Sequence, residues 1–554
     1  MSLSSDDTPT GPIAGLRQAP PGPPPGDPRL PAHPGPEAPG HLTKRLNGVR
    51  DLVALLLLLL APLFPWNLYF GLGIPDSSAV LWGLLGGVTL LSMLALALGR
   101  GRVSANRPRL LLNIPYLLLV VAFVVFDVWE SIKFGGKVNV PGGVGPGGWL
   151  GFAGALLSAQ PVFGRPVIDE EQYHRWLRLA RIIGYASMFG ASLSAGFNLC
   201  WRLRYALVGS DGSTSFGTRN IVVIMTAVVY GVVALAAVLV ASRWVLRYAN
   251  GSRLATLWLG GSTLLAGIIV WALPAGREID AFHGIAQNTS TAGVGYEGYV
   301  AWAGAAAIFA PLALFSSRET RRDRETWRAA IRKGLALIIV WCLGSALMRV
   351  TDLAVAVLMN YPYSRYDISM LAVFDITTAV LAWWLRAKLA SGALRSRLLV
   401  WLSGLVLALM ISRVILGVLL APRFAQASVG PVYGNDLAQQ IDSTFDVTLC
   451  GLALCVLVAI IVAGRIRKPR RPRRRGPVQR PAPRASGPGR PRVPLPTRPS
   501  GPPPPSEART TQFGAAGYDA PTSVLSGQGH PPHPAQPGAA GPRPKIYRPP
   551  ADPS

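Results

Sequence analysis

Long apolar runs alternate with short polar segments along most of the chain, and the charged residues are collected in those short segments. A helix of about 20 apolar residues crosses a hydrocarbon core about 30 Å thick, because each residue advances the helix by about 1.5 Å. The runs therefore predict an all-α fold, a polytopic bundle of twelve transmembrane helices. The predicted spans are residues 52–73, 79–98, 110–131, 148–163, 182–201, 220–242, 254–273, 298–315, 335–358, 369–386, 398–420 and 441–464.

Composition supports this class of protein. Of the 554 residues, 50% are hydrophobic and only 15% are charged. The chain has 54 Lys and Arg against 27 Asp and Glu, a formal charge of +27. Nucleic-acid-binding proteins share such a balance, but here the basic residues occupy short loops and one tail. This distribution is typical of topology signals that face an anionic leaflet, so we expect a lipid bilayer and no nucleic acid as the partner.

The basic loops predict the orientation of the spans. The segment from Arg318 to Lys333 holds seven Lys or Arg residues, and basic loops face the cytoplasm. Twelve spans then place both termini in the cytoplasm and the protein in the cell membrane as a multi-pass protein. The span at 148–163 is short and Gly-rich, but without it the segment would face outward. The first forty residues lack the features of a cleavable signal peptide.

Three regions are predicted along the chain. Residues 1–45 form a disordered Pro/Gly-rich arm, residues 46–464 the twelve-helix transmembrane domain, and residues 465–554 a disordered, basic, Pro-rich cytoplasmic tail. The first eleven residues of the tail should bind anionic lipid headgroups. Pro491 to Pro505 is polyproline-like and suits the aromatic groove of a cytoplasmic protein partner. The alternative is a tail that stays flexible and solvated.

Two basic segments have a helical pattern of their own. Residues 169–181 begin with acidic residues and end with arginines, and residues 321–333 repeat the arrangement with Trp327. Acids in a first turn and bases in a last turn stabilise a helix through its dipole. We predict two short interfacial helices, each leading into a span. The alternative is that the basic residues of the two segments only fix the orientation of the spans in the membrane.

Cysteine and histidine give no indication of a cofactor. All four cysteines lie in apolar stretches and none forms a Cys-x-x-Cys pair, and the six histidines lie in tails or loops. We therefore expect no metal, haem or other cofactor. No catalytic residues are predicted.

Charged residues within the last four predicted spans form a repeated pattern. Arg349 precedes the run Phe374 to Thr377, which is Phe-Asp-Ile-Thr, and Arg413 precedes the run Phe445 to Thr448, which is Phe-Asp-Val-Thr. A charge at the centre of a membrane helix costs about 2.5 to 3.5 kcal/mol, so such residues persist where they pair or function. The spans that carry these arginines open with Trp-x-x-Gly, as does the span at 254–273, which indicates a duplicated helical hairpin with a third, neutral copy.

These charges predict a polar cluster in the outer half of the membrane. Helical rise places them at comparable depth, and the cluster comprises Arg349, Asp352, Asp375, Arg413, Asp442 and Asp446. Two bases would face four acids, and a low dielectric disfavours the resulting negative excess. One hypothesis is that an acid, with Asp375 or Asp446 favoured, takes up a proton or binds a cationic or hydroxyl-bearing ligand. The alternative is that the arginines only pin helices together.

Three classes of function fit these features. The preferred one is a transporter- or permease-like protein that moves a small molecule or a lipid, although the basic loop at 99–109 lacks the acidic residue of the major facilitator loop motif. A non-enzymatic scaffold of the envelope or of division would recruit partners through its Pro-rich arms. A membrane-embedded transferase with a lipid-linked donor is third, because the first outer loop is tiny and offers only Asp76. An enzyme is therefore disfavoured.

The layout of the chain resembles that of one group of proteins. Arg far outnumbers Lys, the arms are rich in Ala, Pro and Gly, and Arg50-Asp51-Leu-Val-Ala precedes the first Leu run. In these features the chain resembles uncharacterised multi-pass membrane proteins of high-GC actinobacteria with proline-rich cytoplasmic tails. The resemblance covers the whole architecture. It implies a location in the cytoplasmic membrane and brings no known activity.

Overall fold

The structure is a computed structural model. It describes residues 40–66, 78–98, 106–134, 143–163, 170–208, 216–273, 295–315, 320–358, 360, 364–391, 396–420 and 444–465. The chain divides into two units, residues 1–473 and 474–554, and all described residues lie in the first. The predicted arm up to residue 39 and the tail from residue 466 lie outside the described residues. Within the described ranges the fold is all-α, with no strand, which confirms the predicted class.

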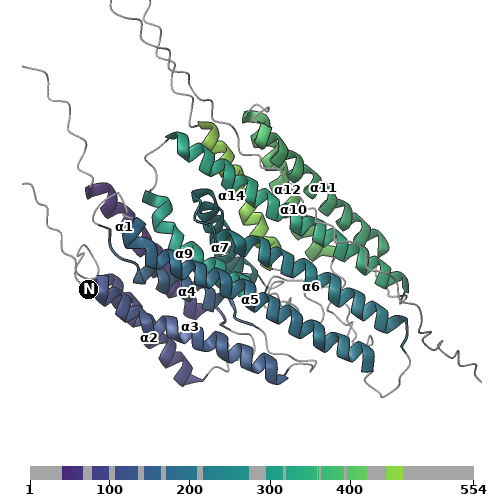
Figure 1. Ribbon diagram of the computed structural model, residues 1–554, viewed down its shortest axis with the longest axis horizontal. Helices are drawn as coiled ribbons and strands as arrows, with labels where there is room; N and C mark the ends of the chain where they lie inside the picture. Colours follow the sequence, from purple (N-terminus) through teal and green to yellow (C-terminus); the bar gives the residue numbers. More distant parts are fainter. Residues whose placement is uncertain are drawn as a thin grey trace, which may run out of the picture. The chain divides into compact units, whose positions relative to one another are not determined.

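Twelve α-helices and one short 3-10 helix make up the described part, and its long helices run side by side (Figure 1). They are α1 (Gly40–Leu60), η1 (Ala61–Leu63), α2 (Ala79–Leu98), α3 (Asn106–Phe134), α4 (Pro146–Ala159), α5 (Glu170–Val208), α6 (Thr218–Val245), α7 (Asn250–Ala272), α9 (Tyr296–Phe315), α10 (Thr320–Leu358), α11 (Arg365–Ser391), α12 (Ser396–Leu420) and α14 (Thr444–Arg465).

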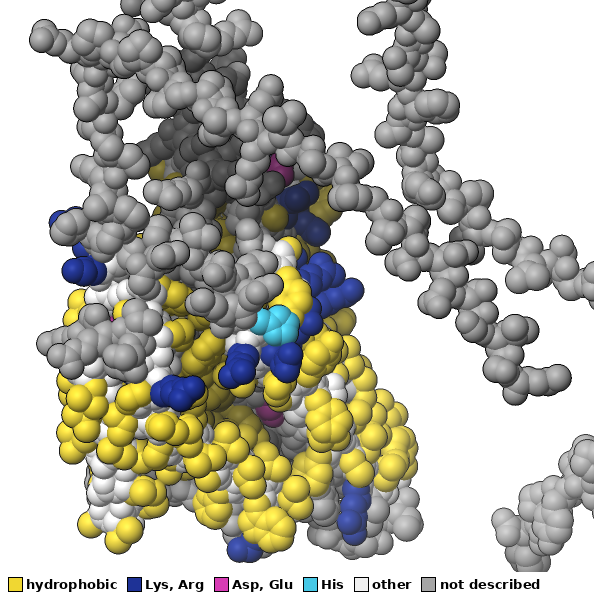
Figure 2. Space-filling view, turned by 60° about the vertical axis from the view of Figure 1, so that its left-hand side comes forward, with side chains coloured by type: hydrophobic (Ala, Val, Ile, Leu, Met, Phe, Trp, Pro, Cys, Tyr) yellow, Lys and Arg dark blue, Asp and Glu magenta, His cyan; other side chains and the backbone are white. Residues whose placement is uncertain are grey.

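Nine of the described helices are long and apolar enough to cross a membrane. Their outer faces keep large apolar side chains exposed, among them Leu90 at 66%, Val125 at 62% and Leu419 at 70%. Figure 2 shows this apolar surface in yellow over much of the described part. Water would disfavour so much exposed apolar area, whereas lipid tails cover it. The described part is therefore a membrane-type helical bundle.

The first helix differs from its predicted span, residues 52–73. It begins at Gly40, so residues 40–45, predicted to belong to the disordered arm, form its first turns. It ends at Leu60, and Pro62 lies in the 3-10 helix that follows. Proline has no backbone N–H to continue an α-helix, and Pro65 soon follows. The apolar run in the sequence extends past these prolines, whereas the α-helix ends before them.

The fourth helix is short and lies inside the bundle. Its 14 residues are about 21 Å long, less than the thickness of a hydrocarbon core, and all of them except Phe152 are buried. It packs against α1, α3 and α9. Glycine makes these contacts close, because a Cβ at Gly154 would lie 3.0 Å from Leu58 Cγ. The helix ends at Ala159, before the predicted limit of residue 163.

The two predicted interfacial helices are not separate elements. The segment at 170–181 is the beginning of α5, and the segment at 321–333 is the beginning of α10; each of these helices is 39 residues long. Neither segment contains proline or glycine; Gly334 directly follows the second segment, and a single glycine weakens a helix by about 1 kcal/mol without ending it. The basic segments therefore extend the spans as continuous helices.

The last six helices pack as the predicted hairpins require. α7 packs against α9, α10 against α11, and α12 against α14. α14 also packs against α7 and α10, and its Phe445 ring lies edge-on to the ring of Trp341 at 4.7 Å between centroids. The Trp-x-x-Gly copies differ in environment, because Trp341 is 1% exposed and Trp401 is 78% exposed. The helices that carry the paired charges therefore meet around the N-terminal end of α14.

Candidate functional site

One face of α10 carries the polar groups of the candidate site. Trp341, Ser345 and Arg349 are spaced four residues apart, so they lie in a row along that face. α11 and α14 pack against α10, and α12 packs against both α11 and α14. The helices α11, α12 and α14 contribute, in that order, Asp375, Arg413 and Asp446.

The arginines and aspartates form a chain of ion pairs. Arg349 Nε donates to Asp375 Oδ2 at 3.0 Å. Arg413 Nε contacts the other oxygen of the same carboxylate, and Arg413 Nη1 donates to Asp446 Oδ1 at 2.6 Å. We call Arg349, Asp375, Arg413 and Asp446 the four-charge network. With two positive and two negative groups, the network has no net charge when all four are ionised.

Neutral side chains complete the hydrogen bonding of this network. Arg413 Nη2 donates to Ser345 Oγ at 2.8 Å, and the indole N–H of Trp341 donates to Asp446 Oδ1. Every member of the four-charge network is at most 5% exposed. Buried ionised groups are stable only when they are paired and hydrogen-bonded, and here both acids are held by Arg413.

Of the other two acids of the predicted cluster, Asp352 is not part of the network. Asp352 lies on α10 one turn beyond Arg349, but it accepts a hydrogen bond from the Tyr230 hydroxyl of α6. It is half-buried, and within the described residues no arginine or lysine forms an ion pair with it. Asp442 lies outside the described residues. Among the described groups, two bases therefore face two acids, with a third acid beside them.

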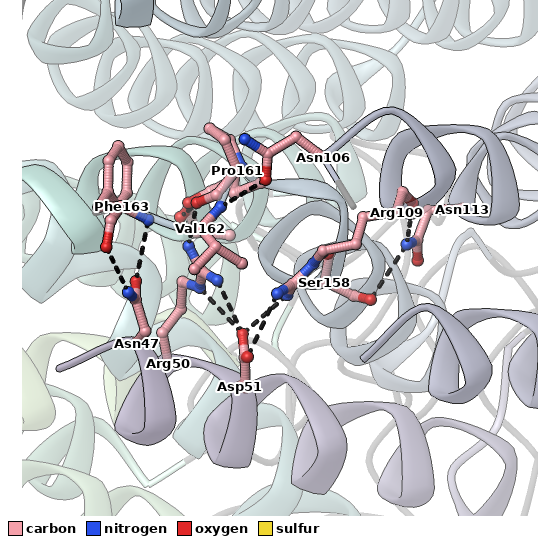
Figure 3. Close-up of polar contacts among 12 residues, drawn as sticks. Asn47, Arg50, Asp51, Asn106, Arg109, Asn113, Ser158, Pro161, Val162 and Phe163 are labelled. Carbon is pink, nitrogen blue, oxygen red and sulfur yellow. Dashed lines mark hydrogen bonds and ion pairs between the residues drawn. The ribbon is translucent and has the colours of Figure 1, made fainter. Parts of the chain in front are cut away.

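A second polar cluster joins the middle of α1 and the beginning of α3 to the end of α4 and the residues just after it (Figure 3). Asp51 accepts hydrogen bonds from Arg50 at 2.9 Å and from Arg109 at 2.7 Å, so one carboxylate bridges two guanidinium groups. The amide of Asn47 donates to the carbonyl of Phe163 at 2.8 Å. The cluster therefore connects three helices that are distant in the sequence.

The same arginines bind backbone oxygens where α4 ends. Arg109 Nε donates to the Ser158 carbonyl at 2.9 Å, and Arg50 Nη1 donates to the Pro161 carbonyl at 2.6 Å. The last carbonyls of a helix have no partner within it and form the negative end of its dipole. The Arg109 guanidinium supplies one of the missing donors, Arg50 binds the segment just beyond the helix, and both bring positive charge to the negative end of the dipole. We call Arg50, Asp51 and Arg109 the α4 cap.

A family model described as "Domain of unknown function (DUF7937)" matches residues 47–465. The chain belongs to this family. Comparisons with curated proteins and with solved structures found no match. The match begins in α1 and ends at the last residue of α14, so the DUF7937 domain includes the four-charge network and the α4 cap.

Sequence reasoning did not recognise the α4 cap of the DUF7937 domain. Arg50 and Asp51 were noted only as the opening of a Leu run, and Arg109 only as part of a basic loop. A signal was present, because each arginine directly precedes an apolar run and one has an acid beside it. Their partners, however, are backbone carbonyls of a distant helix, which no side-chain pattern reveals.

One cysteine of the DUF7937 domain, Cys342, packs as an apolar group. Cys342 is buried, and its sulfur lies 3.9 Å from the sulfur of Met410. Among the described residues, no group of three or more His, Cys, Asp or Glu side chains is placed to hold a metal ion.

Asp51→Asn should destabilise the DUF7937 domain by about 2 kcal/mol, because Arg50 and Arg109 would lose a shared, charged acceptor and face each other without an anion. The measurement is the thermal unfolding midpoint of the purified protein in detergent. Asp367→Asn in the first turn of α11 is the matched control and should lower the midpoint much less, because it removes only a helix-dipole interaction of about 0.3 to 1 kcal/mol. Equal midpoints for the two variants would contradict a stabilising role of the α4 cap.

Proposed function

We propose that this DUF7937 protein is a transporter- or permease-like protein of the cell membrane that moves a small molecule or a lipid. The observation that carries the proposal is the four-charge network, which places ionised groups from α10, α11, α12 and α14 inside a membrane-type bundle. Charged residues at such positions are rare and mark substrate or ion pathways. A bundle that only anchored its arms would need none of them.

The arrangement of charges also suits a bundle whose helices move. In the network Arg413 is shared, since it binds acids on two different helices. A shared cation can release one carboxylate to bind a substrate group while it still holds the other, so the cation itself is never without a partner. If the charges only held the helices together, one separate ion pair at each helix contact would be enough. The sharing of Arg413 therefore favours the transport proposal over the pin.

The proposed orientation has both termini in the cytoplasm. Near Lys333 of α10 lie Arg243 of α6 and Arg247 just beyond the end of α6, and the guanidinium of Arg181 lies 3.5 Å from the ring centroid of Tyr248. Most of the Lys and Arg side chains visible in Figure 2 lie in a band near one end of the apolar surface. Such a band suits the cytoplasmic leaflet, whose anionic headgroups would also bind the basic tail.

The test is complementation of a deletion strain with a charge-neutral double variant. Arg349→Gln with Asp375→Asn removes one positive and one negative charge and leaves the Arg413 and Asp446 pair in place. The folded yield should stay near that of the wild type, because no charge is left unpaired. The metabolite and envelope-lipid profile of the deletion strain should, however, remain uncorrected.

The matched control changes Arg365 and Asp367, one base and one acid in the first turn of α11, by the same chemical changes, and it should restore the profile fully. If the network variant folds and also restores the profile, the network is a pin and the transport proposal fails. A chain that lacks residues 465–554 separates the scaffold alternative. Loss of function from that truncation alone would favour a scaffold that recruits partners through its tail.

A further inference from the structure

Asp352 is the described acid of the predicted cluster that forms no ion pair with the four-charge network. The network is neutral by itself, so an ionised Asp352 adds one negative charge with no ion-pair partner among the described residues. An unpaired charge is disfavoured at low dielectric. A carboxylate can lose its charge by binding a proton. Asp375 and Asp446, which the sequence favoured for this role, are already neutralised by arginines.

The surroundings of Asp352 are weakly polar. Tyr230 of α6 donates its hydroxyl to the Asp352 carboxylate, and the same hydroxyl lies 3.5 Å from the Met348 carbonyl. Arg349 is on the same helix face, but its Nε is bound to Asp375. A phenol lends a hydrogen bond without a charge, so it can serve both the ionised and the protonated acid.

The other helices that pack against α10 leave this position without a cation of its own. They are α7, α11 and α14. Asp375 of α11 and Asp446 of α14 belong to the network, and the ionisable residue of α7 is Arg253, which lies by Tyr248. Asp352 is also half-buried, whereas both network acids are almost completely buried. The Asp352 carboxylate is therefore less enclosed by protein than the acids beside it.

We propose that Asp352, with Tyr230 as its hydrogen-bond donor, is the proton-binding group of this protein. The inference rests on the proposed transport function and names its coupling ion. In the step itself, the carboxylate takes a proton from water and becomes a neutral carboxylic acid, and the tyrosine keeps its own proton. When the proton returns to water, the carboxylate is restored.

The geometry favours a proton over a metal cation. A Ca²⁺ ion takes about six to eight oxygen ligands, and Mg²⁺ demands near-ideal octahedral geometry and is usually bound through one or two carboxylates and a substrate phosphate. The described groups at this position offer the Asp352 carboxylate, the Tyr230 hydroxyl and the Met348 carbonyl. A proton needs one oxygen and is stabilised by one hydrogen bond. Protonation also makes the whole group of charges neutral, which lowers the cost of moving α10 against α6 within lipid.

The experiment is infrared difference spectroscopy of the full-length protein in nanodiscs of phosphatidylethanolamine and phosphatidylglycerol, titrated with acid. The wild type should gain a protonated-carboxyl C=O band that Asp352→Asn lacks. Tyr230→Phe keeps the acid and should shift the band to higher frequency, because its C=O loses a hydrogen bond. Asp367→Asn is the matched control and should keep the band unchanged.

The outcomes separate this inference from the proposed function. If the wild type and Asp352→Asn give the same carboxyl bands, the inference is overturned, while the complementation test still decides on transport. If Asp352→Asn does not fold, the frequency shift in Tyr230→Phe decides instead, and an unshifted band overturns the inference. If the band is lost as expected but Asp352→Asn restores the deletion strain fully, Asp352 binds protons and the coupling to transport fails.

Discussion

Arg413→Met should cost about 3 to 5 kcal/mol of stability, the loss expected when one partner of a buried ion pair is removed. Arg413 holds the carboxylates of both Asp375 and Asp446, and each of the three is at most 3% exposed. Without it, Arg349 would face two buried acids and the site would carry a net negative charge. The thermal unfolding midpoint and the folded yield in detergent measure the loss.

A charge-compensated variant is the control for Arg413. Arg413→Met together with Asp446→Asn leaves the pair of Arg349 and Asp375, which is neutral. This double variant should recover most of the lost stability, because unpaired charge and not missing volume is the main cost. A double variant as unstable as Arg413→Met would show that packing of the long side chain, and not its charge, holds the four helices together.

Gly260→Ala should be strongly destabilising, because α7 and α9 cross with almost no space between their backbones. A Cβ at this position would overlap the carbonyl of Trp302 and the Cβ of Ala306, and it would lie 2.8 Å from the Trp302 carbonyl carbon. Backbone atoms cannot move aside as a flexible side chain does. Overpacking of this kind costs about 1 to 3 kcal/mol or more, measured as a fall in the unfolding midpoint.

The neighbouring glycine is a matched control for this contact. A Cβ at Gly261 would meet no atom within 4 Å. Gly261→Ala should therefore be neutral or stabilise the helix by about 0.5 to 1 kcal/mol, because alanine loses less backbone entropy in a helix. If the two alanine variants have the same midpoint, close packing of α7 on α9 does not contribute to stability.

The sequence predicts best the helices that contact lipid. α2 occupies the predicted residues 79–98, and α12 begins two residues before its predicted span at 398–420. In both helices an unbroken run of apolar residues predicts where the chain spans the membrane. The pattern fails where other rules decide. Prolines end α1 within an apolar run, and α5 and α10 continue through charged segments because nothing there breaks a helix.

The candidate site was accessible to sequence reasoning only in part. Opposite charges in adjacent spans indicated a meeting of Arg and Asp side chains, and the described contacts join four of the six residues named. Which acid each arginine holds depends on the rotation of the helices about their axes. An apolar pattern that surrounds the helix does not specify that rotation. The sequence therefore places Asp352 in the same cluster as the other acids, although its partner is Tyr230 on another helix.

The enclosure of α4 has a consequence for biogenesis. A short, Gly-rich segment that protein surrounds gains little from lipid on its own, so it cannot settle early as an independent span. Part of its enclosure comes from α9, which the ribosome makes much later. In nascent chains that stop before α9, the α4 segment should therefore lack part of its packing contacts in the membrane. The arrival of α9 is then the point at which quality-control proteases can distinguish a finished molecule from an unfinished one.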